Sequence, residues 1–148
     1  MGQEDLQAPE VIRAAGGDLV ASPLHLPFEL RAKLESYALA EFPHEACGTL
    51  IGRRTARGVE VVRLEQGRNL AASTVSFTLD PAHLVHAEGL AQAAGLELVG
   101  IWHSHPNMPA VPSEADLETA WSGWSHLIAS VTAAGVSELR EYGSRFPV

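Results

Sequence analysis

The stretch HSHPNMPAVPSEAD, from His103 to Asp116, holds residue types that bind metal ions. His103 and His105 end an apolar segment that is typical of a β-strand. Because alternate residues of a strand face the same side, both imidazoles can reach one ion. Asp116 follows beyond a proline-rich loop, which can return its carboxylate to the histidines. Two histidines and one carboxylate are typical of a catalytic zinc site, since they leave one coordination position for water.

A zinc hydrolase also requires a general base that is not itself a ligand. Glu45, in the string PHEACG before an apolar segment, is the candidate. A carboxylate within hydrogen-bonding reach of the activated water can take its proton and pass it to a leaving nitrogen. Ser113 can donate a hydrogen bond to the oxyanion that develops beside the metal. We therefore predict Glu45 and Ser113 as catalytic residues, and His103, His105 and Asp116 as metal ligands.

Each of these residues also has a simpler structural interpretation. Two histidines on a strand are as often hydrogen-bonded partners as ligands. Ser113, followed by Glu114 and Asp116, is typical of a helix N-cap with acids in the first turn, and this role can coexist with a catalytic one. Glu45 taken alone is typical of a solvated loop. Cys47, the only cysteine, is expected to be a small buried side chain rather than a nucleophile.

Other zinc architectures with an HxH pair fit the sequence less well. Metallo-β-lactamase relatives require HxHxDH, but Asn107 and Met108 follow the histidines here. Zinc deaminases require a PCxxC segment, which one cysteine cannot supply. The HExxH motif of another metalloprotease class is absent.

A mixture of strands and helices must position these residues. Apolar periodicity predicts strands over residues 24–26, 46–51, 59–64, 75–79, 96–102, 127–131 and 136–142, with turns over 53–58 and at Gly135. Helices are predicted from Pro27 to Phe42, from an N-cap at Asp80 to a C-cap at Gly95, and briefly from Ser113. This pattern indicates a mixed sheet packed against helices, an α/β or α+β sandwich.

Length and charge limit the class of protein. The 148 residues fit one domain, with residues 1–20 expected to form a flexible tail and residues 21–148 the domain. A net charge of −8 argues against general binding of nucleic acid. No apolar run approaches the roughly 20 residues of a membrane span, and the first residues lack the apolar core of a signal peptide. With a single cysteine, these features lead us to expect a cytoplasmic protein.

Taken together, these motifs resemble the JAMM (MPN-plus, JAB-type) metalloprotease family. The family pattern is an upstream glutamate, then H-[ST]-H-P, and then S-x-x-D. Seven residues, counting that proline, separate the second histidine from the serine. The strings EACGTLIG, HSHP and PSEAD fit it without a gap. The resemblance implies that His103, His105 and Asp116 bind one zinc ion, that Glu45 is the general base and that Ser113 assists the oxyanion.

The resemblance covers about residues 24–142 and implies a fold and a reaction. The implied fold is a cytidine-deaminase-like α/β/α sandwich with a mixed central sheet. The implied reaction is hydrolysis of the bond after the C-terminal Gly-Gly of a ubiquitin-like protein. Since the chain is similar to short bacterial-type members, the expected partner is a ubiquitin-like sulfur carrier. One alternative is a non-catalytic MPN scaffold, and another is a JAMM hydrolase of a different substrate, such as cell-wall peptide.

Overall fold

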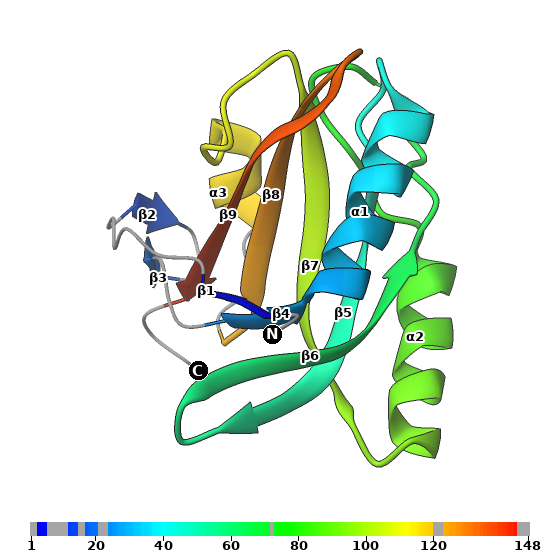
Figure 1. Cartoon of the computed structure of the whole chain (residues 1–148), viewed down its shortest axis with the longest axis vertical. Helices are drawn as coiled ribbons and strands as arrows, with labels where there is room; N and C mark the ends of the chain where they lie inside the picture. The colour runs from blue at the N-terminus through cyan, green and yellow to red at the C-terminus, as the bar shows by residue number, and fades with distance from the viewer. Residues whose placement is uncertain are drawn as a thin grey trace.

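The computed structural model describes residues 3–5, 12–14, 17–20, 24–71, 73–119 and 123–144. Within these ranges the strands form one mixed sheet in the order β1-β4-β6-β5-β7-β8-β9-β3-β2 (Figure 1). The strands are β1 (Gln3–Asp5), β2 (Ile12–Ala14), β3 (Gly17–Val20), β4 (Leu24–Pro27), β5 (Cys47–Thr55), β6 (Gly58–Gln66), β7 (Glu97–Pro106), β8 (Ser125–Thr132) and β9 (Gly135–Ser144). The helices are α1 (Phe28–Glu41), α2 (Pro81–Ala93) and α3 (Glu114–Thr119).

The pairing of the central strands brings distant segments of the chain together. Strand β5 pairs antiparallel with β6 on one side and with β7 on the other, and β7 pairs parallel with β8. In this register Cys47, the first residue of β5, lies opposite His103 near the end of β7. The segment that immediately precedes β5 therefore lies beside the end of β7 that carries the histidines.

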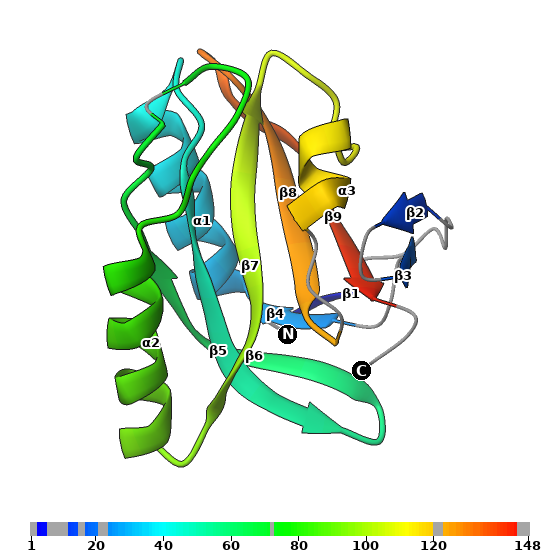
Figure 2. The same cartoon turned by 180° about the vertical axis from the view of Figure 1, so that it is seen from behind.

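Helices cover both faces of the sheet. Successive strand residues point to opposite sides, so apolar residues of β5 pack against helices on each side. On β5, Leu50 belongs to the core that includes Leu34 of α1, whereas Ile51 packs with Ala87 and Ala91 of α2. Figures 1 and 2 show α1 on one side of the sheet, and α2 with α3 on the other. This arrangement is an α/β/α sandwich with a mixed sheet, as predicted. None of the described helices is long and apolar enough to cross a membrane.

Strands β5, β6 and β7 approach one another closely on the α1 side of the sheet, opposite the histidines. The Trp102 ring stacks on Tyr37 of α1 with ring centroids 6.1 Å apart, and its indole N–H donates to the Glu65 carbonyl at 3.0 Å. A Cβ atom at Gly48 would lie 2.4 Å from Trp102 Nε1 and 2.0 Å from the Glu65 carbonyl oxygen. Only glycine fits at this position without displacing that hydrogen bond.

Most of the predicted elements are confirmed, with shifts at their ends. The Asp80 side chain caps α2 by accepting the Ala82 N–H, and Gly95 follows the Ala94 C-cap with a φ of +71°. Helix α1 begins at Phe28, because Pro27 is the last residue of β4 and becomes the N-cap. The hairpin turn is shorter than predicted, since its strands continue to Thr55 and resume at Gly58.

The predicted strand over residues 75–79 is wrong. This segment lies in a loop between β6 and α2, and its one ladder contact is an isolated bridge between Asn69 and Leu79. Val75 is 66% exposed, so the apolar alternation of this segment does not reflect one buried strand face.

Three described strands fall within residues 1–20. Strand β1 pairs with β4, β2 pairs with β3, and β3 pairs with β9, all antiparallel. The remaining residues of this segment lie outside the described ranges. The division into a flexible tail and a domain that begins at residue 21 stays a prediction.

Candidate metal centre

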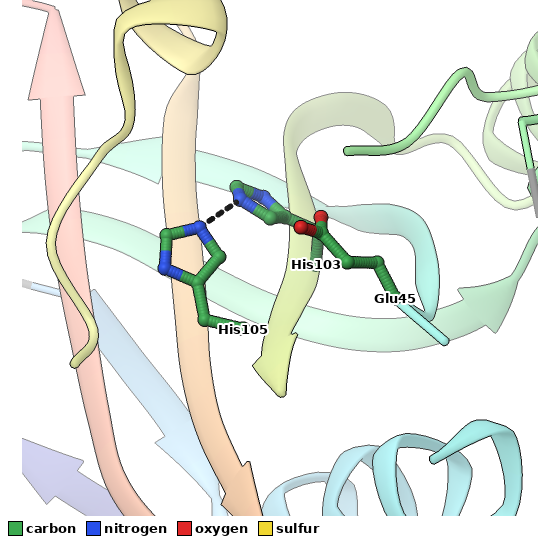
Figure 3. A group of neighbouring side chains, drawn as sticks. All are labelled: Glu45, His103 and His105. Atoms are coloured by element: carbon green, nitrogen blue, oxygen red, sulfur yellow. Dashed lines mark hydrogen bonds between the residues drawn. The ribbon is translucent and has the colours of Figure 1, made fainter. Parts of the chain in front are cut away.

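Three potential ligand atoms meet at the C-terminal end of β7. His103 Nε2 lies 3.1 Å from His105 Nε2 (Figure 3). Asp116 Oδ2 lies 3.1 Å from each of these nitrogens. Ligands held about 2.0–2.1 Å from a tetrahedral zinc ion are roughly 3.3 Å apart. The spacing of the three atoms therefore fits one metal ion bound by all three side chains.

The strand and the following helix explain why these side chains converge. His103 and His105 share one face of β7, as alternate residues must, and both are buried. Asp116 lies in the first turn of α3, where Ser113 Oγ accepts the Asp116 N–H at 3.1 Å and Asp116 Oδ2 accepts the Ser113 N–H at 2.9 Å. This reciprocal pair is a capping box with aspartate in the acidic position. The predicted N-cap role of Ser113 is confirmed, and its hydroxyl proton is not used in that pair.

A backbone contact fixes the tautomer of one imidazole. His105 Nδ1 lies 2.9 Å from the Pro109 carbonyl oxygen, which can only accept, so Nδ1 carries the proton. The lone pair of the neutral ring is then on Nε2, the atom that faces His103 and Asp116. The loop after β7 therefore turns the lone pair of a neutral His105 toward His103 and Asp116.

Glu45 reaches the same place from the segment before β5. Its carboxylate and the His103 and His105 ligand nitrogens lie within 4.8 Å of one another, and Figure 3 shows the carboxylate beside the His103 ring. The side chain is 2% exposed, and Glu45 Oε1 is buried without a hydrogen-bonding partner in the part of the chain that the structure describes. Glu45 is thus a buried carboxylate beside the histidines and not the solvated loop residue of the simpler interpretation.

Electrostatics differ between the two carboxylates. Burial raises the pKa of Glu45 to about 7, with the charge of Asp116 adding to the effect and His105 opposing it. Burial acts in the same direction on Asp116, but hydrogen bonds from His103 and His105 outweigh it and hold the Asp116 pKa well below its usual range. Burial lowers the pKa of His103. Ionised Asp116 and neutral His103 are the forms that bind a metal ion.

A cavity of about 300 Å³ opens beside His103 and Asp116. Its lining is mainly apolar and includes Phe77, Ile101 and Ile128. The Phe77 ring stacks on the His103 imidazole with centroids 4.4 Å apart. An apolar surface therefore lies next to the two candidate ligands His103 and Asp116. Sequence reasoning missed Phe77, and its one signal was an aromatic residue in a stretch wrongly predicted as a strand.

Comparison with known families matches residues 28–142 to the prokaryotic homologues of the JAB domain. The chain belongs to this family. The match covers most of the span over which the motifs resemble JAMM proteins, so that resemblance is confirmed.

Individual relatives of this JAB domain agree with the family match. A desampylase from Haloferax volcanii is 36% identical over 118 residues, which are 76% of this chain and 84% of the relative. A Thermus thermophilus protein named "Probable TtuB-protein conjugate cleaving protease" is 35% identical over 98 residues, 66% of this chain and 63% of the relative. The solution structure of a Desulfitobacterium hafniense protein is similar with a TM-score of 0.63 and 30% identity, over 74% of this chain and 85% of that one.

Cys47 of the JAB domain is a structural residue, as predicted. It is fully buried, and burial raises the pKa of its thiol to about 12. A thiol in this environment stays protonated at neutral pH and is a poor nucleophile. Cys47 is therefore not a candidate nucleophile for this site.

Proposed function

We propose that this JAB domain is a zinc-dependent isopeptidase. It hydrolyses the bond after the C-terminal Gly-Gly of a ubiquitin-like sulfur-carrier protein. The observation that carries the proposal is the convergence of the buried Glu45 carboxylate, whose Oε1 has no hydrogen-bonding partner among the described residues, with the triangle of His103, His105 and Asp116. A non-catalytic scaffold is expected to lack one or more of these residues, and all are present.

His103, His105 and Asp116 are the residues that would hold the ion, and nitrogen and carboxylate donors are a set that suits zinc. A bound zinc ion supplies Lewis-acid chemistry, because it polarises a carbonyl oxygen and makes water a stronger acid. The Ser113 N–H donates to Asp116 and favours its ionised form, and in neutral His105 the Pro109 carbonyl holds the proton on Nδ1. With both imidazoles neutral and their protons on Nδ1, the three side chains would direct lone pairs to one point.

Glu45 carries the proton in this mechanism. Its carboxylate takes a proton from the attacking water, and the water oxygen bonds to the scissile carbonyl carbon. The same carboxyl then gives the proton to the nitrogen as the carbon–nitrogen bond breaks, which yields a C-terminal carboxylic acid and a free amine; the acid then loses its proton to solvent. Ser113 Oγ–H donates to the carbonyl oxygen as that oxygen gains negative charge. The raised pKa of Glu45 suits a group that both accepts and releases a proton near neutral pH.

The substrate class is supported by the relatives and by the resemblance. One relative is named for cleaving TtuB-protein conjugates, and another is named a desampylase. Cleavage of a protein conjugate requires a site that accepts an extended chain end. The apolar cavity beside His103 and Asp116 provides such a surface.

The test is to incubate the zinc-loaded protein with ubiquitin-like sulfur carriers that are each extended beyond Gly-Gly. Intact mass spectrometry is expected to show a loss of mass that places the cut after Gly-Gly, and no cut with Glu45→Ala. Glu114→Gln, a change at an exposed acid of α3, is the control and is expected to cut normally. Cleavage at the same rate by Glu45→Ala would contradict the assigned base. If the protein cleaved muropeptides but cleaved none of the carriers, the assigned substrate would be contradicted.

A further inference from the structure

The carboxylate tip of Glu45 is not fixed by hydrogen bonds at both of its oxygens. Oε1 is buried and has no partner among the described residues. A base that must take and release a proton cannot be tied permanently to another donor. Its position relative to His103 and His105 therefore depends on how firmly its backbone is held.

All four backbone hydrogen-bonding groups of the Glu45–Ala46 dipeptide are satisfied. The Glu45 N–H donates to the Ser73 carbonyl at 2.8 Å, and the Glu45 carbonyl accepts from Asn69 Nδ2 at 2.8 Å. The Ala46 N–H donates to Ser104 Oγ at 2.8 Å, and the Ala46 carbonyl accepts from the Ser104 N–H at 2.9 Å. Two of the four bonds use side chains, so the contribution of each side chain can be tested by substitution.

The Asn69 amide joins the loop before α2 to the backbone of the base. Its Oδ1 atom accepts the N–H groups of Ala71 at 3.0 Å and Thr78 at 2.9 Å. Its Nδ2 atom donates to the Glu45 carbonyl and, at 3.5 Å, to the Ser76 carbonyl. Because one end of the amide meets only donors and the other only acceptors, its partners fix its orientation. The acceptor half shapes the loop, and the donor half holds Glu45.

Ser104 acts from the opposite face of β7. It lies between the two histidines in sequence, so its side chain points away from them, and it is fully buried. Its hydroxyl oxygen is the partner of the Ala46 N–H. One strand therefore presents the histidines on one face and uses its other face to hold the chain next to Glu45.

We propose that Asn69 and Ser104 are positioning residues that set the location of Glu45 relative to the metal-binding histidines. They act through the backbone of Glu45 and Ala46 and not by contact with substrate. The inference rests on the proposed role of Glu45 as the base. In enzymes, a misplacement of about 1 Å can lower a rate by roughly a hundredfold, so small shifts of this backbone have measurable effects.

The first arm of the test uses steady-state kinetics. Asn69→Asp keeps the shape and the acceptor half of the side chain but loses the donors to Glu45, and Ser104→Ala loses the partner of Ala46. Both are expected to lower kcat by about tenfold or more, with KM and bound zinc unchanged. Thr55→Ala is the matched control, because it removes side-chain hydrogen bonds to Arg57 and Gly58 at the far end of β5. It is expected to leave kcat unchanged.

The second arm is amide hydrogen exchange, which needs no substrate. In Ser104→Ala the Ala46 amide is expected to exchange faster than in the native protein. In Asn69→Asp the Ala71 and Thr78 amides are expected to keep their protection, which separates a lost hold on Glu45 from a collapsed loop.

Each arm of the test has an outcome that would contradict the proposal. An unchanged kcat in both variants, a loss confined to KM, or unchanged exchange at Ala46 in Ser104→Ala would each overturn the proposal. If the native protein cleaved no carrier, the proposed function would fail, and exchange at Ala46 would still decide whether Ser104 holds this backbone.

Discussion

Two carboxylates face the same pair of imidazoles, and the chain holds them in opposite ways. Asp116 is held at its tip, where Oδ2 contacts both His103 and His105 and accepts the Ser113 N–H. Glu45 is held at its backbone, and its Oε1 atom has no partner among the described residues. A carboxylate fixed by three contacts suits a metal ligand. A carboxylate with an oxygen left without a hydrogen bond, on a fixed backbone, suits a group that transfers protons.

The pKa values of Asp116 and Glu45 differ in a way that agrees with this contrast. Hydrogen bonds keep the Asp116 pKa low despite its burial, while burial raises the pKa of Glu45 to about 7. Environments that push two neighbouring carboxyl groups in opposite directions mark a division of roles. Here the proposed division is between an ionised metal ligand, Asp116, and a proton carrier, Glu45.

The largest effect is expected from Asp116→Asn. The amide oxygen can still accept the Ser113 N–H and preserve the capping box, but the charged ligand is lost. Zinc affinity is expected to fall by more than the roughly 10–100-fold that loss of an outer-shell partner costs, and turnover is expected to fall with it. Zinc titration checks this, with Glu114→Gln as the control. Unchanged affinity would remove Asp116 from the ligand set.

A smaller effect is expected in the pH dependence of the metal-free protein. A carboxyl whose folded pKa is raised contributes stability that is full below its unfolded pKa of 4.5 and is lost as pH rises through about 7. Glu45→Gln lacks this group. The Tm of the metal-free native protein is therefore expected to fall relative to Glu45→Gln as pH rises across that range. Calorimetry of both proteins checks this, and parallel curves would show that Glu45 is not a strained, buried acid.

The smallest effect is expected from Phe77→Ala, which removes the ring that stacks on His103 and lines the cavity. Loss of this apolar lining reduces the surface that a bound substrate can bury, so a several-fold rise in KM is expected. Phe28→Ala, at a residue that is 59% exposed at the start of α1, is the control. A loss in kcat with KM unchanged would place Phe77 in the positioning of His103 and not in substrate binding.

The Asp116 side of the site could be predicted from the sequence because its geometry is local. Alternation along a strand puts His103 and His105 on one face, and a serine three residues before an acid is a capping pattern. Prolines restrict the backbone whatever their neighbours are, so the loop between them could be expected to return the chain. The central strands and both longer helices followed from similar local patterns.

The Glu45 side could be predicted in composition but not in how it is held. Asn69 is 24 residues from its partner Glu45 in sequence, and Ser104 is 58 residues from its partner Ala46. No spacing rule connects residues so far apart. The loop between β6 and α2 was wrongly predicted because Val75, Phe77 and Leu79 alternate as strand residues do. Their positions depend on the Asn69 amide and on the His103 ring, which are tertiary contacts.

The division of roles between the two carboxylates is tested most directly by the zinc content of Glu45→Gln. The substitution keeps the size of the side chain and removes its capacity to carry a proton. We expect one zinc ion per chain at native affinity, with cleavage of the carrier conjugate abolished. Loss of zinc from Glu45→Gln, to the extent seen in Asp116→Asn, would contradict it and would make Glu45 a ligand.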